Sequence, residues 1–171
     1  DKSYRLGVEL AAAWKPNTHF RWDANVALSQ NKIKDYTPYL PDANWEKSVA
    51  QSTMKTTTIS FSPSVVANSV ISYNLKGFAA SLTSQYVGRQ YMDNLELKGN
   101  SLDAYFVSHL NASYTFALRR CKEITIGGTI YNLFNAMYET NGYSVTSLDA
   151  NNKVTSLSLI HISEPTRPLY I

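Results

Sequence analysis

Residues 4–15 have the sequence YRLGVELAAAWK, and residues 20–29 have the sequence FRWDANVALS. In both stretches apolar side chains alternate with polar or small ones. A period of two is that of a β-strand, whose successive side chains point to opposite faces. Between the two stretches, Pro16 presets φ and Asn17 tolerates left-handed geometry, so a tight turn is expected there. The region therefore predicts a long antiparallel hairpin with one apolar face and one polar face.

The same alternation recurs in four further stretches, so that about six strands in three hairpins are expected. These stretches are 63–73, 78–91, 106–116 and 124–135. Short turns join the two strands of each hairpin, and long polar loops separate the hairpins, the first with room for a short local element. The short turns are 16–19, 74–77 and 117–123, and the long loops are 32–58, 92–104 and 136–153.

The length of the strands separates two fold classes. Strands in soluble proteins run to about 5–6 residues, whereas a tilted strand that crosses a membrane needs about 9–11. The sequence therefore predicts an all-β fold, an antiparallel transmembrane β-barrel fragment with short periplasmic turns and long extracellular loops. The alternative is a soluble β-sandwich that binds glycans through aromatic side chains of its loops.

The composition fits a chain with one apolar face. Of the 171 residues, 44% are hydrophobic and 12% aromatic, while only 17% are charged, against about 25% in an ordinary soluble domain. This excludes intrinsic disorder, which needs low hydrophobicity and high net charge. The net charge of +3 comes from scattered basic residues, the tightest cluster being Arg119, Arg120 and Lys122. Nucleic acid is therefore not an expected partner.

Aromatic residues gather at the two ends of the predicted strands, as in the girdles of a membrane protein. The girdle near the tight turns is expected to contain Trp14, Phe20, Trp22, Tyr73, Phe78, Tyr114 and Phe116. The girdle near the long loops is expected to contain Tyr4, Tyr86, Tyr91 and Tyr105.

Two further groups follow from the strand phase and the loops. Polar side chains expected to face the lumen are Glu9, Arg21, Asp23, Asn25, His109 and Asn111. Loop aromatics that are candidates for extracellular ligand contacts are Tyr36, Tyr39, Trp45, Tyr138 and Tyr143. For any single one of these residues, a solvated polar face or simple loop packing is the alternative.

Nothing in the sequence indicates catalysis or a cofactor. His19, His109, His161 and Cys121 do not have metal-ligand spacing. No glycine-rich phosphate loop or nucleophile elbow is found. No nucleophile or acid–base pair with a supporting group stands out either. The chain is therefore not expected to be an enzyme, and no cofactor is expected.

The sequence resembles the late barrel strands of TonB-dependent outer-membrane receptors, in the version found in Bacteroidetes-type bacteria. The matching stretches are GVEL at 7–10 before the Trp-Lys-Pro turn, NVALSQNKI at 25–33, GFAASLTSQYVGRQYMDN at 77–94, SLDAYFV at 101–107, NASYTF at 111–116 and IYNLFNAMY at 130–138. The Asn-Leu-Phe-Asn stretch ahead of Tyr138 is the most telling, because these receptors carry it on the penultimate strand. The resemblance covers about residues 4–145.

The resemblance implies a barrel of about 22 strands, plugged by a globular domain, in the outer membrane of a Gram-negative bacterium. It implies energised import of a siderophore-, haem-, cobalamin- or glycan-type ligand. The implied partners are outer-membrane lipid, the receptor's own plug domain and the TonB protein. We expect the plug and the TonB-docking segment to lie outside this chain.

The last residues depart from the family pattern, which predicts one more alternating strand with an aromatic end. Residues 158–171 instead read SLIHISEPTRPLYI. That string resembles the translation of a sequencing adapter. We therefore expect residues 1–157 to be part of a receptor barrel and residues 158–171 to be a non-biological tail.

Overall fold

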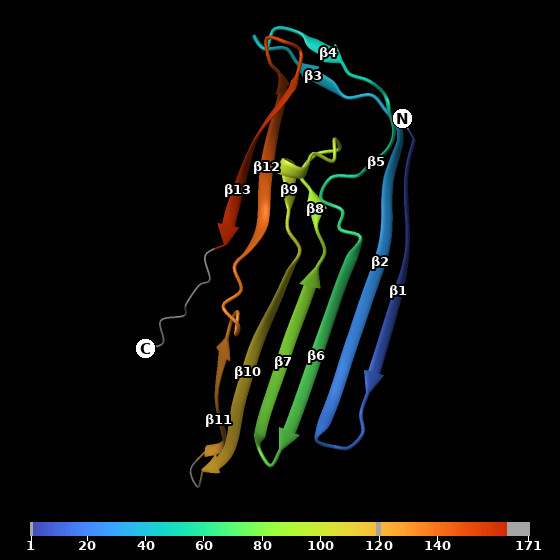
Figure 1. The fold of residues 1–171 in the computed structure, drawn as a ribbon. Helices are drawn as coiled ribbons and strands as arrows, with labels where there is room; N and C mark the ends of the chain where they lie inside the picture. Colours follow the sequence, from blue (N-terminus) through green and yellow to red (C-terminus); the bar gives the residue numbers. More distant parts are fainter. Residues whose placement is uncertain (1, 119–120, 164–171) are drawn as a thin grey trace.

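Long antiparallel strands make up most of the molecule. The computed structural model describes residues 2–118 and 121–163. Six long strands lie side by side in the order β1-β2-β6-β7-β10-β11, with every neighbouring pair antiparallel (Figure 1). Their bounds are β1 (Lys2–Trp14), β2 (Phe20–Tyr36), β6 (Val65–Leu75), β7 (Phe78–Val87), β10 (Tyr105–Leu118) and β11 (Cys121–Ile130). The predicted all-β class and the three hairpins are confirmed.

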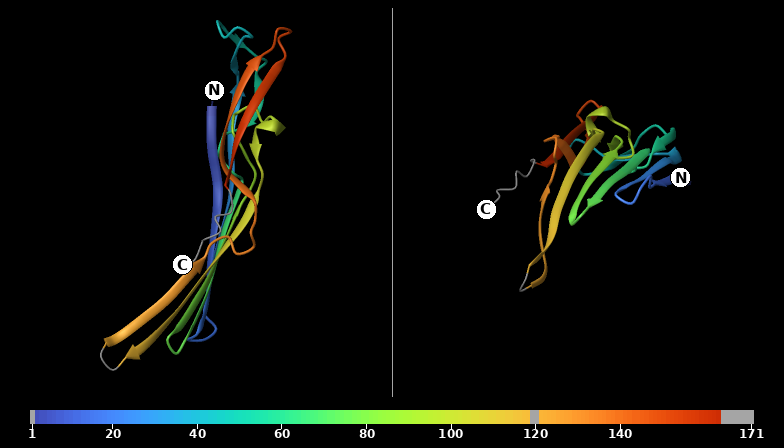
Figure 2. Two further views of the ribbon diagram at one scale, coloured as in Figure 1. Left: turned by 90° about the vertical axis from the view of Figure 1, so that its left-hand side faces the viewer. Right: turned by 90° about the horizontal axis from the view of Figure 1, so that it is seen from below.

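The six-stranded sheet is open. Its two edges are β1 and β11, which do not pair with each other. Seen from below, the strands follow an arc that does not close (Figure 2). A β-sandwich would bury one face of this sheet against a second sheet, and among the described residues no second sheet covers the apolar face defined below.

The remaining elements gather at the end of the sheet away from the tight turns, which we call the loop end (residues 32–64, 88–104 and 137–163; Figure 1). They are β3 (Tyr39–Pro41), β4 (Ser48–Ala50), β5 (Met54–Thr58), β8 (Gln90–Tyr91), a 3-10 helix (Lys98–Asn100), β9 (Ser101–Leu102), β12 (Tyr138–Leu148) and β13 (Val154–Ser163). β5 extends the main sheet by pairing with β2, while β3–β4, β8–β9 and β12–β13 form separate two-stranded sheets.

Two predicted boundaries are wrong. The predicted loop 136–153 contains β12, which pairs with β13 from Leu148↔Val154 to Tyr138↔Ser163. Its Tyr, Val and Thr residues favour a strand once a partner is present, and much of that partner lies in the predicted non-biological tail. In addition, β2 continues to Tyr36, inside the predicted loop 32–58, because β5 pairs with it there.

The predicted turn 117–123 and the predicted tail are only partly covered by the described residues. Residues 119–120, which hold two of the three clustered basic residues, lie outside the described residues. Residues 158–163 belong to β13, and residues 164–171 lie outside the described residues. The non-biological tail therefore stays a prediction.

The strand register brings the apolar phase of all six strands to one side of the sheet. Directly paired residues of antiparallel neighbours point to the same side. One row of paired residues crosses the whole sheet and consists of Trp14, Trp22, Ile71, Leu82, Leu110 and Ile130. A row on the opposite side consists of Arg21, Ser72, Ser81, Asn111 and Thr129. A one-residue slip in any strand would break both rows, so the register is strongly specified.

Large apolar side chains are exposed on one side of the six-stranded sheet, which we call the apolar face. They are Leu6, Val8, Leu10, Trp14, Trp22, Leu28, Ile71, Tyr73, Leu75, Phe78, Tyr86, Phe106, Tyr114, Ile126 and Ile130. Within the described parts of these strands, no large apolar side chain is exposed on the opposite side, the polar face. Exposure on this scale is unusual for a protein in water and indicates a surface that another apolar medium or partner covers.

The buried core lies at the loop end. The buried apolar side chains of the described residues are Leu40, Val87, Met92, Leu102, Val107 and Leu148. Leu102 and Leu148 are 0% and 1% exposed. Val87 and Val107 belong to the polar face, so the loop-end elements cover that face and leave the apolar face open.

The turn between β6 and β7 shows how the tight turns fix the register. Leu75 pairs with Phe78, which leaves Lys76 and Gly77 as a two-residue loop with φ of 45° and 86°. Two positive φ values define a type I′ turn, whose twist matches that of the strands. A Cβ on Gly77 would lie 2.3 Å from the carbonyl oxygen of Thr115, so glycine is required here for space as well as for conformation. The predicted turn is confirmed, but it consists of residues 76–77, because Asn74 and Leu75 of the predicted turn 74–77 belong to β6.

Candidate functional site

The polar face carries hydrogen bonds between side chains that the register places opposite each other. Asn68 donates to Asn25 Oδ1 at 3.0 Å, and Asn111 donates to Thr129 Oγ1 at 2.7 Å. Such pairs lock neighbouring strands together without using apolar area. The sequence placed Asn25 and Asn111 on this face, but not their partners, which depend on register.

Arg21 and Asp23 form an ion pair on the same face of β2. The guanidinium donates two hydrogen bonds, from Nε and Nη2, each 2.6 Å long, to the two carboxylate oxygens of Asp23. Residues two apart in a strand point to the same side, which is why the pair can form. The side chains are 56% and 36% exposed, so the pair is available to a polar partner and adds little stability by itself. Glu9 lies on this face opposite Ala27 and is exposed.

His109 holds the chain where β11 ends. Its Nδ1 accepts a hydrogen bond from the backbone N–H of Asn132 at 3.0 Å, and its ring lies edge-on to Tyr131 at 5.4 Å. Asn132 has a φ of 49°, and its side chain bonds both the N–H and the carbonyl oxygen of Ala136. This closed turn ends the strand five residues before the predicted boundary at Asn135. The conspicuous Asn-Leu-Phe-Asn stretch thus has a local structural role.

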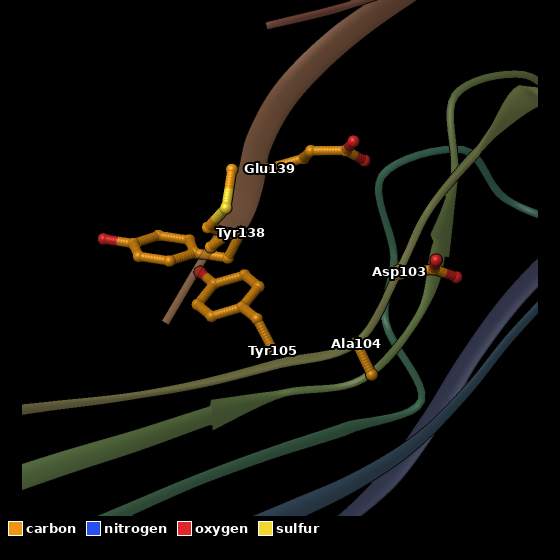
Figure 3. Close-up of a pocket in the computed structure, with 6 residues that line it drawn as sticks. Asp103, Ala104, Tyr105, Tyr138 and Glu139 are labelled. Carbon is orange, nitrogen blue, oxygen red and sulfur yellow. The ribbon is translucent and has the colours of Figure 1, made fainter. Parts of the chain in front are cut away.

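A pocket of about 180 Å³ lies where the start of β10 meets the start of β12. It is lined by Asp103, Ala104, Tyr105, Met137, Tyr138 and Glu139 (Figure 3). The rings of Tyr105 and Tyr138 stack with centroids 4.7 Å apart, and Asp103 lies across the pocket from them. Aromatic surface beside two carboxylates suits a ligand that stacks on a ring and donates hydrogen bonds.

The five loop aromatics predicted as ligand contacts do not form one site. Only Tyr138 lines this pocket. Tyr36 lies at the end of β2 opposite Met54, and Tyr143 lies within β12. Tyr39 and Trp45 lie on or beside the β3–β4 hairpin and are 68% and 62% exposed.

The aromatic residues near the tight turns share the apolar face. Register pairs connect them, among them Trp14 with Trp22 and Phe78 with Tyr114. Trp22 Nε1 donates to Ser69 Oγ at 2.9 Å, which satisfies the indole N–H. At the loop end, Tyr4 and Tyr86 also lie on the apolar face, but Tyr105 pairs with Val87 and lies on the polar face. The expectation that Tyr105 belongs to a girdle is therefore wrong, because it rested on the position of Tyr105 at a strand end and not on the strand phase.

Glu96 is a functional candidate that the sequence analysis missed. It lies between β8 and β9, accepts a hydrogen bond from Thr58 Oγ1, and lies 3.1 Å from Lys32 Nζ. Burial is the largest single effect and raises the pKa of Glu96, but the bonds from Thr58 and Lys32 and the Lys32 charge outweigh it, so the pKa is lower than usual. The carboxylate is therefore a fixed negative charge at the loop end. No sequence spacing connects these three residues, because the loops bring them together.

A scan against protein-family models finds no match to this chain, and a search of curated proteins finds none either. Within residues 2–118 and 121–163, no group of three or more His, Cys, Asp and Glu side chains is placed to hold a metal ion. No helix of the described chain is long and apolar enough to cross a membrane.

Proposed function

We propose that this chain is part of the β-barrel of an outer-membrane transport receptor of a Gram-negative bacterium. The observation that carries the proposal is the continuous apolar face, in which one row of six paired apolar residues crosses every long strand. The strands have 10 to 17 residues, enough to cross the hydrocarbon core at a tilt. Lipid would cover the apolar face, and further strands would cover the edges of β1 and β11.

The orientation follows from the two ends of the sheet. Outer-membrane barrels have short periplasmic turns and longer extracellular loops. The turns at 15–19 and 76–77 therefore face the periplasm, and the loop end, with the pocket at Tyr105 and Tyr138, faces outward. In this orientation the aromatic residues near the tight turns lie at the periplasmic interface, where Trp and Tyr are favoured.

The polar face would then line the lumen. Glu9 and Arg21 are exposed there and Asp23 is half-buried, and all three offer polar contacts to the plug domain of the same receptor. The resemblance to TonB-dependent receptors supplies the rest of the proposal: import of a siderophore-, haem-, cobalamin- or glycan-type ligand, driven through TonB. The pocket at Tyr105 and Tyr138 is the proposed ligand contact at the outer mouth, and neither catalysis nor a cofactor is part of the proposal.

Arginine placed on either face of β2 tests the lipid assignment. Val26 lies on the apolar face, and its neighbour Ala27 lies on the polar face. Val26→Arg should lower binding of the refolded chain to phosphatidylcholine vesicles by about 2–4 kcal/mol, the cost of arginine near the bilayer midplane. Flotation of the vesicles measures the bound fraction.

Ala27→Arg is the matched control, because it adds the same charge one residue away. It should leave vesicle binding close to that of the unmodified chain. Val8→Arg on β1 should repeat the effect of Val26→Arg, since Val8 lies on the apolar face and is 59% exposed. Equal losses for Val26→Arg and Ala27→Arg would refute the proposal.

A further inference from the structure

Residues 92–100, which we call the strap, make hydrogen bonds to the β12–β13 hairpin. Asp93 Oδ2 accepts from Ser144 Oγ at 3.1 Å, and Asn100 Nδ2 reaches Thr146 Oγ1 at 3.4 Å. Ser156 Oγ donates to Asn100 Oδ1 at 2.7 Å. The strap therefore contacts both strands of this hairpin through polar side chains.

The same strap makes a second set of bonds to the segment around β5, on the other side. The carbonyl oxygen of Asn94 accepts from Thr57 Oγ1 at 2.5 Å, and its side-chain Oδ1 accepts from the N–H of Ser60 at 2.8 Å. Glu96 adds the ion pair with Lys32 of β2. Thr57 is fully buried, so these bonds are shielded from water.

Internal bonds connect the two sides of the strap. Asn100 Nδ2 donates to Asp93 Oδ2 at 2.5 Å, and Asp93 Oδ1 accepts from the N–H of Leu95 at 2.9 Å. The backbone N–H of Met92 donates to the carbonyl oxygen of Asn100 at 2.8 Å. Asn100 is 1% exposed, and both ends of its amide are bonded. Loss of this side chain would leave several buried groups unpaired, which costs more than one exposed bond.

We propose that the strap couples the β12–β13 hairpin, through residues 144–156, to the β2–β5 pair, so that the loop end opens and closes as one cooperative unit. A displacement of the hairpin at Ser144 and Ser156 displaces Asp93 and Asn100, which are bonded to them. The bonds from Thr57 and Ser60 to Asn94 of the strap then transmit the displacement to the segment around β5. The coupling is inferred from these contacts and does not require that lipid covers the apolar face. β12 also packs against β3, so the test must separate the strap from this direct contact.

Hydrogen exchange of backbone amides in the full chain, held in detergent micelles, tests the coupling. Asn100→Ala should speed exchange in β12–β13 by about tenfold. It should also speed exchange at residues 56–60, although the hydrogen bonds described for Asn100 do not reach them. Lys32→Met breaks the other side of the strap. By reciprocity, it should speed exchange in the β12–β13 hairpin as well as in β5.

Thr155→Val is the matched control. Among the described residues, Thr155 bonds only within its own hairpin, to the carbonyl oxygen and the hydroxyl of Ser147. Its loss should therefore speed exchange in β12–β13 and leave residues 56–60 unchanged. The proposal is overturned if Asn100→Ala speeds exchange in the hairpin alone, or if Thr155→Val affects residues 56–60 as strongly. If Asn100→Ala does not fold, Lys32→Met decides: unchanged exchange in β12–β13 overturns the coupling.

Discussion

The six-stranded sheet and the loop end differ in where their apolar side chains lie. In the sheet, residues such as Leu10 and Ile126 are more than 60% exposed, and the apolar side chains form a surface. At the loop end, Leu102 and Leu148 are buried, and polar loops surround them. The loop end has its own core, whereas the sheet needs an apolar environment from outside the described chain. The molecule thus combines a sheet with an exposed apolar face and a loop end with a buried core.

Polar groups show the same contrast. On the polar face of the sheet, hydrogen bonds join paired residues of neighbouring strands, such as Asn25 and Asn68. At the loop end, they join residues that are not paired in any strand ladder, such as Lys32 and Glu96. Strand pairing fixes the first kind, while the second kind holds the loops in place.

The largest difference between the two regions should appear with leucine-to-alanine substitutions. Leu102→Ala leaves a cavity in the loop-end core and should lower its stability by about 2–5 kcal/mol. Leu10→Ala leaves no cavity, because Leu10 is 61% exposed. It should instead weaken vesicle binding by about 1–2 kcal/mol through lost apolar area. Hydrogen exchange at the loop end and vesicle flotation measure the two quantities.

The contrast between the sheet and the loop end is refuted if Leu10→Ala lowers loop-end stability as much as Leu102→Ala does, or if Leu102→Ala weakens vesicle binding as much as Leu10→Ala does. A loss of loop-end stability in Leu10→Ala would mean that the sheet and the loop end share one core. Unchanged vesicle binding in Leu10→Ala would mean that lipid does not cover the apolar face at β1.

A smaller, pH-dependent effect is expected at the loop end alone. The pKa of Glu96 in the folded chain is lower than its ordinary value of 4.5. Its contribution to stability is therefore fully present above about pH 4.5 and is lost as the pH falls through the lower folded value. Urea unfolding in detergent should show a loss of stability on acidification from neutral pH to below this value.

Glu96→Gln isolates this effect, because glutamine can still accept the bonds from Thr58 and Lys32 but does not titrate. The variant should lose less stability on acidification than the unmodified chain. Equal losses in the two chains would show that Glu96 does not link the loop end to pH.

The sequence was sufficient for the strands and hairpins of the sheet because strand phase and turn chemistry are local. The pairing of β2 with β6 and of β7 with β10 joins distant residues and was not predicted. Alternation between Tyr4 and Trp14, and the glycine at Gly77, predicted two hairpins whose apolar faces the register then aligned. The loop end was not predictable in this way. β12 needs β13 as a partner, and the strap contacts of Asp93 and Asn100 join residues 46 to 56 positions apart. Such contacts leave no periodic pattern in the sequence.

The candidate site residues also divide into those that strand phase predicted and those that it did not. The polar-face positions of Arg21, Asp23 and Asn111 followed from strand phase. Tyr105 was assigned to a girdle because it lies at the end of a strand, but its pairing with Val87 places it on the polar face. Its stacking with Tyr138, which forms the pocket, depends on a strand that the sequence analysis placed in a loop.

Tryptophan fluorescence in vesicles tests the central claim, that lipid covers the apolar face, most directly. Trp14 and Trp22 lie on this face near the tight turns, and Trp45 lies at the loop end. Phospholipids brominated near the headgroup should quench the emission of a Trp45→Phe variant, which keeps the first two residues. They should leave the emission of a variant that keeps only Trp45 unchanged. Unquenched emission from Trp14 and Trp22 in vesicle-bound chain would contradict the account.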